Sequence, residues 1–205
     1  RSTLFPYTTL FRSLADGPYL DPDTGVMRNR LGITDADELA QREEDEAALA
    51  TAKLLFTLRP TRWDPALLRF LHQQLFGQLY DWAGQYRTVE ISKGTPRFAA
   101  AQHIPAQVEA VLAELEQERT DWSPGDDAVL DRLAHFYSEL NAIHPFRDGN
   151  GRTIRLLLSL LANRYHWDLQ WQHTTAEHNQ HACALAFYGD GTALREVMWR
   201  VGSRI

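Results

Sequence analysis

The sequence predicts a mainly α-helical protein with one β-hairpin, and three observations support this fold class. Apolar residues recur three and four positions apart over long stretches, which is the spacing of amphipathic helices. Clusters of turn-forming residues separate these stretches. Only residues 86–99 contain short strand-like runs around a turn. We therefore expect a helical bundle that carries a single hairpin.

The first part of the chain contains an arm and two helices. Residues 19–33 are rich in Asp, Pro and Gly and are expected to form an irregular arm. Thr34 is the expected N-cap of a helix over residues 34–58, because an acidic residue follows three positions later. The acidic residues 43–46 are expected to be a solvated face of this helix. Leucines at helical spacing predict a second helix over residues 65–75.

The hairpin is predicted after an aromatic turn at residues 79–84. Residues 86–91 form a short β-like run, residues 92–96 a turn, and residues 97–99 a return strand. Taken alone, such a feature indicates no more than a surface hairpin.

The second half of the chain is predicted to be helical. The segment over residues 154–162 is apolar on several sides, so we expect it to be the central helix of the bundle. Residues 167–171 are expected to link it to a final helix pair. The other helices are predicted over residues 102–119, 127–142, 175–188 and 192–201.

Composition limits the class of protein. A chain of 205 residues with 44% hydrophobic and 23% charged residues is typical of one globular domain. Its formal net charge of −6 argues against a protein that binds nucleic acid directly. Cys183 is the only cysteine, which excludes an intrachain disulfide and fits a reducing, cytoplasmic location. No apolar run approaches the length of a transmembrane helix, so we expect no membrane partner.

Residues 1–13 are expected to lie outside the native protein. Residues 4–13 back-translate to a string that resembles a common sequencing adapter, and the chain does not begin with Met. The segment also lacks the cationic start and apolar core of a secretory signal. We therefore divide the chain into an artefact over residues 1–13, an arm over residues 14–33 and a domain over residues 34–205.

One run, HPFRDGNGRTIR at residues 144–155, concentrates the chemistry of the sequence. Gly149 and Gly151 flank Asn150 and can adopt backbone angles closed to other residues, so that consecutive N–H groups form a nest. A helix follows, and its unpaired N–H groups and dipole attract an anion to the same place. These features predict a phosphate-binding loop.

The charged residues of the run fit that prediction. Arg152 and Arg155, three positions apart, can fork onto phosphate oxygens. Asp148 is a hard oxygen ligand suited to the Mg²⁺ that commonly bridges phosphates. His144 can accept a proton near neutral pH. Each residue alone also fits an ordinary turn, cap or helix surface, but the combination favours a nucleotide site with a built-in base.

The run resembles the signature of Fic-domain proteins, His-Pro-Phe-x-Asp/Glu-Gly-Asn-Gly-Arg-x-x-Arg, at every specified position. The resemblance extends from about residue 19 into the C-terminal region. It implies a Fic-type helical bundle over residues 34–205, and a protein adenylyltransferase (AMPylase). Such an enzyme moves AMP from ATP, with Mg²⁺, to a Tyr, Ser or Thr hydroxyl of a target protein.

The resemblance also implies roles for individual residues. His144 would be the base and Asp148 the Mg²⁺ ligand. The hairpin would be a flap that pairs with the target segment by strand addition. The residues that would contact phosphates are Gly149, Asn150, Gly151, Arg152 and Arg155. The flap residues expected to dock the target are Ile91, Ser92, Lys93, Gly94 and Thr95.

The sequence lacks a complete inhibitory-helix pattern, and this absence predicts how the activity is controlled. Many Fic proteins carry an inhibitory helix with the pattern Ser/Thr-x-x-x-Glu-Gly/Asn. Here Glu38 is followed by Leu39, and Glu196 by Val197, so neither glutamate completes the pattern. We therefore expect the chain alone to be active, and a separate small antitoxin to supply the inhibitory Glu. This arrangement resembles Fic toxin–antitoxin pairs, whose targets include DNA gyrase and topoisomerase IV.

Three rival functions stay open. A phosphotransferase like the Doc toxins would move the γ-phosphate instead, although its loop is usually altered where this one is intact. A catalytically silent helical binding module would not bind ATP. A DNA-binding regulator fits poorly with the acidic charge balance.

Overall fold

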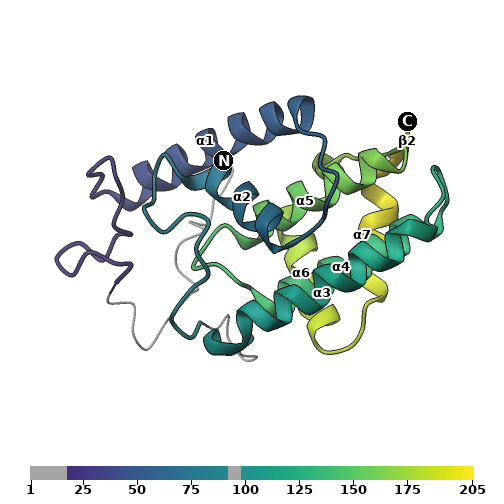
Figure 1. The fold of residues 1–205 in the computed structure, drawn as a ribbon. Helices are drawn as coiled ribbons and strands as arrows, with labels where there is room; N and C mark the ends of the chain where they lie inside the picture. Colours follow the sequence, from purple (N-terminus) through teal and green to yellow (C-terminus); the bar gives the residue numbers. More distant parts are fainter. Residues whose placement is uncertain (1–17, 92–97) are drawn as a thin grey trace.

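The computed structural model describes residues 18–91 and 98–205, and over these it is mainly α-helical (Figure 1). The predicted fold class is confirmed. Three short 3₁₀ helices join or extend the main elements: η1 (Ala101–His103), η2 (Arg119–Asp121) and η3 (Trp171–His173). The α-helices are α1 (Ala36–Thr57), α2 (Pro65–Phe76), α3 (Ile104–Glu118), α4 (Ala128–Ile143), α5 (Asn150–Arg164), α6 (Ala176–Phe187) and α7 (Thr192–Val201).

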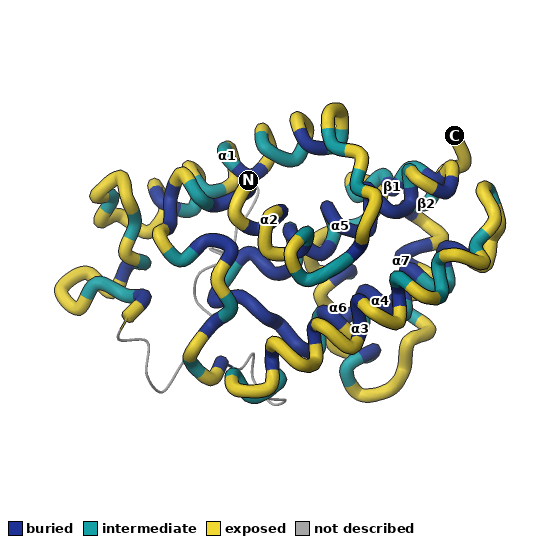
Figure 2. Tube along the Cα trace, in the orientation of Figure 1, coloured by how far each residue is buried: buried dark blue, intermediate teal, exposed yellow. Residues whose placement is uncertain are grey.

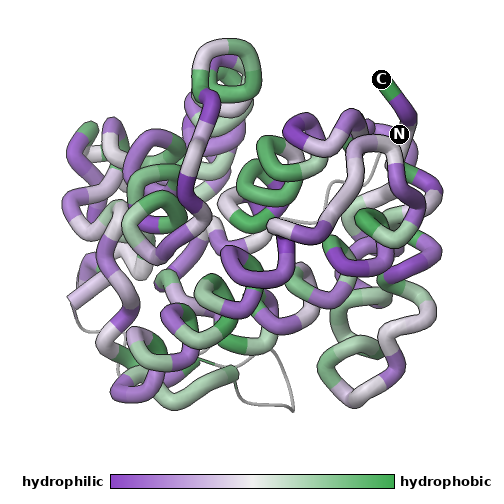
Figure 3. The backbone as a smooth tube through the Cα atoms, turned by 45° about the vertical axis from the view of Figure 1, so that its right-hand side comes forward, coloured by the Kyte–Doolittle hydropathy of each residue, from purple (hydrophilic) through white to green (hydrophobic). Residues whose placement is uncertain are grey.

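Helix α5 is the central element, as its apolar sequence predicts. It packs against α1, α2 and α4, and its residues are buried on most sides (Figure 2). The other helices turn one apolar face inward, so hydrophobic and hydrophilic positions alternate along them (Figure 3). Among the described residues, no helix is both long and apolar enough to cross a bilayer.

Two of the helix starts that differ from the prediction have an identifiable cause. The N-cap of α1 is Asp35 instead of Thr34, because the Asp35 carboxylate accepts the N–H of Glu38 at 2.8 Å. Helix α5 begins at Asn150, inside the motif, and not at residue 154. Gly149 precedes it with φ +74°, so the loop ends at that residue and the helix starts with the next.

The β-structure found in the described residues lies away from the predicted hairpin. Strand β1 (Trp167–Leu169) pairs antiparallel with β2 (Gly202–Arg204), where the sequence had indicated only a link. Residues 86–91 and 98–100 form no strand, and residues 92–97 lie outside the described residues. The carbonyls of Val89 and Ala99 accept hydrogen bonds from the side chain of Arg87. These two carbonyls therefore bind the side chain of Arg87.

The N-terminal arm reaches the motif region. It is irregular, with one isolated bridge between Leu20 and Met27. Tyr19 is buried, meets the Trp82 ring edge-on at 5.8 Å, and accepts the N–H of Thr88 through its hydroxyl at 3.3 Å. The arm thus packs against the connection between α2 and α3.

Candidate active site

His144 stands at the end of α4 in a strained turn. It is the C-cap residue, with φ 50° and ψ 63°, a left-handed conformation that is uncommon for a residue with a side chain. Its Nδ1 lies 3.2 Å from the carbonyl of Asn141. Since a carbonyl only accepts, Nδ1 carries the proton, and in the neutral ring the lone pair lies on Nε2. The backbone turn therefore presents the imidazole in the tautomer that a general base needs.

Phe146 and Asn150 close the loop from inside. The Phe146 side chain is fully buried and stacks on the His72 ring at 3.9 Å. Asn150 accepts the N–H of Phe146 and donates to its carbonyl, both at 2.8 Å. The Asn150 side chain is thus engaged within the loop, and only its backbone N–H would be left to a phosphate.

Asn150→Ala is expected to lower the free energy of unfolding by about 1–3 kcal/mol, because it leaves buried backbone groups of Phe146 without partners. Urea unfolding followed by circular dichroism measures the change. Asn163→Ala, on the same helix, is the matched control and should be neutral or slightly stabilising, because Ala is the better helix former. Equal stability of Asn150→Ala and wild type would contradict the bracing role.

His72 holds the loop from α2, a role that the sequence did not reveal. The N–H of Gly84 donates to Nδ1 at 2.9 Å, so the ring proton lies on Nε2, which donates to the carbonyl of Asp148 at 3.0 Å. Burial lowers the pKa of His72 to about 4, so the ring is neutral at physiological pH. A neutral His72 fixes the backbone of Asp148, while the Asp148 side chain stays about a quarter exposed.

Gly149 is required by two separate constraints. Its φ is +74°, and a Cβ there would lie 2.3 Å from Cε2 of Phe76. Its N–H donates to the Asp148 carboxylate at 2.5 Å. Gly151 does not share this conformation, because it lies within α5. Of the two glycines expected to form the nest, only Gly149 uses the backbone freedom of its residue type.

Arg152 pairs with carboxylates in this structure. Its guanidinium pairs with Glu43 of α1, lies 3.8 Å from Asp148, and sits 4.7 Å from the centre of the Phe76 ring. Burial opposes its charge, but Glu43 and Asp148 outweigh that effect and raise the pKa of Arg152. The guanidinium is therefore held in an anionic environment beside the start of α5.

The burial of Glu43 contradicts the expectation that residues 43–46 form a solvated face. The Glu43 side chain is only 12% exposed and also accepts a hydrogen bond from the Tyr80 hydroxyl. Burial raises the pKa of the Glu43 carboxyl, with Arg152 acting in the opposite direction. The signal was present, because Glu43 lies four residues from both Leu39 and Ala47, which are buried.

The two glutamates singled out from the sequence lie elsewhere. Glu38 and Glu196 are both exposed, and the glutamate that contacts Arg152 is Glu43. The phase of α1 explains the difference between Glu38 and Glu43. Glu38 is five residues before Glu43, which turns it away from the face that packs on α5.

Arg155 does not converge with Arg152 in this structure. Its guanidinium lies 5.8 Å from the Trp171 ring. Burial raises the pKa of Tyr137, and the charge of Arg155 acts to lower it. A Cβ at Gly151 would lie 3.2 Å from its Nη1, so the Arg155 side chain folds back along the first turn of α5. The two arginines therefore have separate surroundings, Arg152 beside α1 and Arg155 beside η3.

The predicted docking residues are only partly described. Ile91 is 2% exposed, so its side chain packs into the protein instead of facing a target. Ser92, Lys93, Gly94 and Thr95 lie outside the described residues.

The donor set fits a Mg²⁺ ion that arrives with a nucleotide. Asp148 offers a partly exposed carboxylate next to the start of α5. Within residues 18–91 and 98–205, no group of three His, Cys, Asp or Glu side chains could hold a metal ion. One carboxylate plus substrate phosphates and water is the usual coordination of Mg²⁺ in phosphate chemistry.

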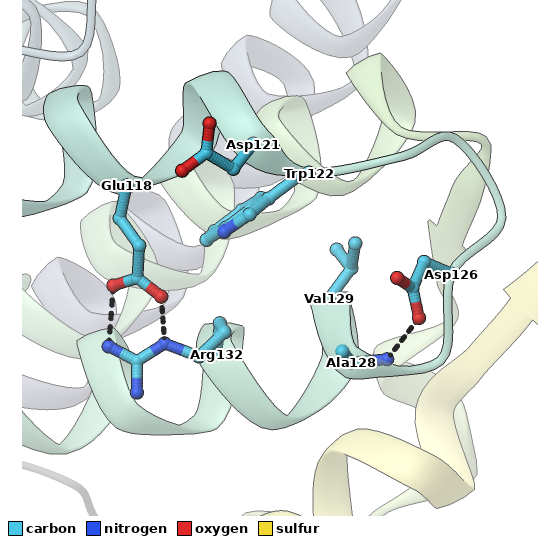
Figure 4. A pocket seen from close by; sticks show the side chains of 7 residues that line it. All are labelled: Glu118, Asp121, Trp122, Asp126, Ala128, Val129 and Arg132. Atoms are coloured by element: carbon cyan, nitrogen blue, oxygen red, sulfur yellow. Dashed lines mark hydrogen bonds and ion pairs between the residues drawn. The ribbon is translucent and has the colours of Figure 1, made fainter.

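A pocket of about 350 Å³ lies at the far end of α4 (Figure 4). Glu118 and Arg132 pair beside it, and Trp122 forms one wall. Helix α4 has 16 residues, a length of about 24 Å, and the motif follows its other end. The pocket is therefore separate from the candidate active site.

Comparisons with known proteins agree with this geometry. Residues 62–162 match the Fic/DOC family. The chain is 37% identical over 180 residues to the Salmonella typhimurium protein named "Probable protein adenylyltransferase Fic", covering 88% of this chain and 89% of that protein. It is 31% identical to protein adenylyltransferase VbhT of Bartonella schoenbuchensis, covering 91% of this chain and 39% of that protein.

The fold is also similar to that of solved Fic-domain structures. The crystal structure of the Bartonella tribocorum effector BepC with bound AMPPNP superposes with a TM-score of 0.84 and 22% identity, covering 92% of this chain and 97% of that chain. This similarity concerns the fold. Together with the sequence match over nearly the full length of its relative, it shows that the chain belongs to the Fic/DOC family.

Proposed function

We propose that the protein is a protein adenylyltransferase that moves AMP from ATP to a Tyr, Ser or Thr hydroxyl of a target protein. The observation that carries this proposal is the position of His144. Its backbone turn and the Asn141 carbonyl present Nε2 as a base, just before the loop that starts α5. Relatives named protein adenylyltransferases support the same reaction.

The reaction would proceed by in-line displacement at the α-phosphorus. The target hydroxyl gives its proton to Nε2 of His144, and its oxygen forms a bond to the α-phosphorus. The bond from the α-phosphorus to the oxygen that bridges to the β-phosphorus breaks, and pyrophosphate leaves. The enzyme positions the two reactants and removes the proton, which is most of what such a transfer requires.

The start of α5 would hold the phosphates. The N–H groups of residues 150–151 and the positive end of the helix dipole favour an anion there, while the N–H of Gly149 donates to the Asp148 carboxylate. Arg152 would contact the β- and γ-phosphates, with Arg155 supporting the tail after a change of side-chain conformation. Asp148 would hold the Mg²⁺ that accompanies ATP, and this ion would supply charge that neutralises the phosphates.

We further propose that the protein is the toxin of a toxin–antitoxin pair and acts in the cytoplasm. The absence of a complete inhibitory pattern in the sequence supports control by a separate protein. An antitoxin helix would bring a glutamate to the motif arginines, and Arg152 already donates to a carboxylate, that of Glu43. Subunits of DNA gyrase and topoisomerase IV are the first targets to test.

The test uses the purified chain with Mg²⁺ and ATP labelled at the α- or the γ-phosphate. Purified gyrase and topoisomerase IV subunits, and a bacterial lysate, serve as acceptors. We expect protein-bound label from α-labelled ATP only, and a mass increase of one AMP on an acceptor. Label from γ-labelled ATP only would identify a phosphotransferase, and no ATP binding in calorimetry would identify a binding module.

A further inference from the structure

Arg87 is a buried arginine whose hydrogen bonds end on backbone carbonyls. It is 2% exposed and lies in the connection between α2 and α3. Its Nε donates to the carbonyl of His144 at 2.9 Å, and its Nη2 donates to that of Ile143 at 3.2 Å. Its Nη1 donates to the carbonyl of Val89 at 2.8 Å, and Nη2 also donates to that of Ala99 at 2.5 Å.

These four carbonyls belong to two segments that are distant in sequence. Ile143 and His144 are at the end of α4, where helix carbonyls lack partners within the helix and favour a cation. Val89 and Ala99 flank residues 90–98. Two backbone bonds join the same segments, from the N–H of Arg87 to Pro145 at 2.9 Å and from that of Ala99 to Ala142 at 3.3 Å.

The conformation of His144 needs such support. A left-handed backbone costs free energy for a residue with a side chain, and persists where the surroundings determine it. The guanidinium of Arg87 holds the carbonyl that follows this strained φ. From the other segment, the Phe98 ring stacks on the His144 imidazole at 3.9 Å with an angle of 14° between the planes. His144 is thus held through its backbone and against its ring by the same connection.

We propose that Arg87 is a positioning residue for the transfer reaction: its guanidinium fixes the turn that presents His144 and ties Val89 and Ala99 to it. This inference rests on the proposed function, in which His144 is the base. Arg87 would act through His144 and would not touch ATP.

The geometry explains why an arginine stands here. A guanidinium presents five N–H donors in a rigid plane, and this one distributes four bonds over carbonyls on two sides. A lysine keeps the charge but concentrates its donors at one point, so it cannot span the same carbonyls. Arg87→Lys therefore removes the spanning geometry and retains the charge.

The phosphate-binding half of the motif has its own supports. Asn150 braces Phe146, and His72 braces Asp148, and neither contact involves Arg87. Loss of the Arg87 geometry should therefore impair transfer without impairing ATP binding. This split separates positioning from a general loss of structure.

The experiment compares the full-length wild type, Arg87→Lys and Arg119→Lys at saturating ATP and Mg²⁺, well below their unfolding temperatures. Arg119 is the matched control, because its side chain is also largely buried and also donates to a backbone carbonyl. This carbonyl belongs to Thr61, at 3.2 Å, and lies far from the motif. The rate of AMP incorporation from α-labelled ATP, the Kd for ATP, and the ¹⁵N shifts of the His144 ring are measured.

For Arg87→Lys we expect a rate about 10²-fold lower, the loss that a misplacement of about 1 Å causes. The Kd for ATP should change by less than about threefold, a small free energy. The His144 ring should lose its preference for the Nδ1–H tautomer, and Arg119→Lys should match the wild type. A wild-type rate, or an unchanged His144 tautomer, in Arg87→Lys would overturn the proposal.

Phe98→Leu tests the same coupling if Arg87→Lys fails to fold, because it removes the ring contact to His144 from a partly exposed position. It should lower the rate and leave the Kd for ATP unchanged, and a wild-type rate would count against the proposal. The tautomer measurement needs no activity. If wild type shows no transfer at all, the proposed function fails, whereas a shifted tautomer in Arg87→Lys would still support the structural link.

Discussion

Replacing His144 by alanine is expected to lower the rate of AMP transfer by about 10²–10⁴-fold, the usual cost of losing a general base. ATP affinity should stay nearly unchanged, because the phosphate-binding part of the motif is held by other residues. The Asn141 carbonyl accepts the Nδ1 proton of His144, which leaves Nε2 as the ring nitrogen that takes the hydroxyl proton, and alanine removes this nitrogen. Intact-mass analysis of the acceptor, together with calorimetry for ATP, measures both quantities.

His135→Ala is the matched control for this variant. His135 lies on the same helix, α4, but its ring faces Glu114 on α3 at 3.2 Å. It should transfer AMP at the wild-type rate. An AMP adduct that forms as fast with His144→Ala as with the wild type would remove His144 from the mechanism.

Arg152→Ala should lower transfer by about 10²–10³-fold, as expected when one preorganised donor to a developing charge is lost. Arg152→Lys should recover only part of the rate, because an ammonium group cannot form the bidentate fork. Initial rates over a range of ATP concentrations separate the loss in kcat from that in KM. Wild-type turnover of Arg152→Lys would exclude a fork contact.

Glu43→Gln shows whether the carboxylate beside Arg152 orients it or blocks it. A guanidinium can bind a carboxylate on one edge and phosphate on another, so we expect Glu43 to orient Arg152. Its replacement should then lower transfer by about tenfold, the effect of one charged hydrogen bond. Glu38→Gln and Glu196→Gln are controls and should match the wild type, because both side chains are exposed. A faster Glu43→Gln would identify an internal brake.

The sequence predicted the helices well because each one buries a periodic apolar stripe. Helix α5 was expected to be central from its apolar residues alone, and it is. The motif residues could be predicted as a candidate site because their chemistry is contiguous along the chain. In both cases the information lies within one short segment.

The contacts between segments were missed for a physical reason. Arg87 binds backbone carbonyls, which every residue carries, so no partner could be recognised from residue types. Glu43 lies among other acidic residues, and only the helical phase set by Leu39 and Ala47 distinguishes it. The β1–β2 pair joins three-residue strands from distant parts of the chain, too short to show alternation.

One aromatic ring links two parts of the site that are usually considered separately. The Phe76 ring fills the space where Gly149 would carry a Cβ and also lies against the Arg152 guanidinium. In evolutionary terms, these positions are not free to drift independently. A lineage that gained a side chain at position 149 would first need a smaller residue in place of Phe76. The Arg152 guanidinium would then lose the ring against which it lies. Descendants that keep the ring are therefore committed to keeping the glycine.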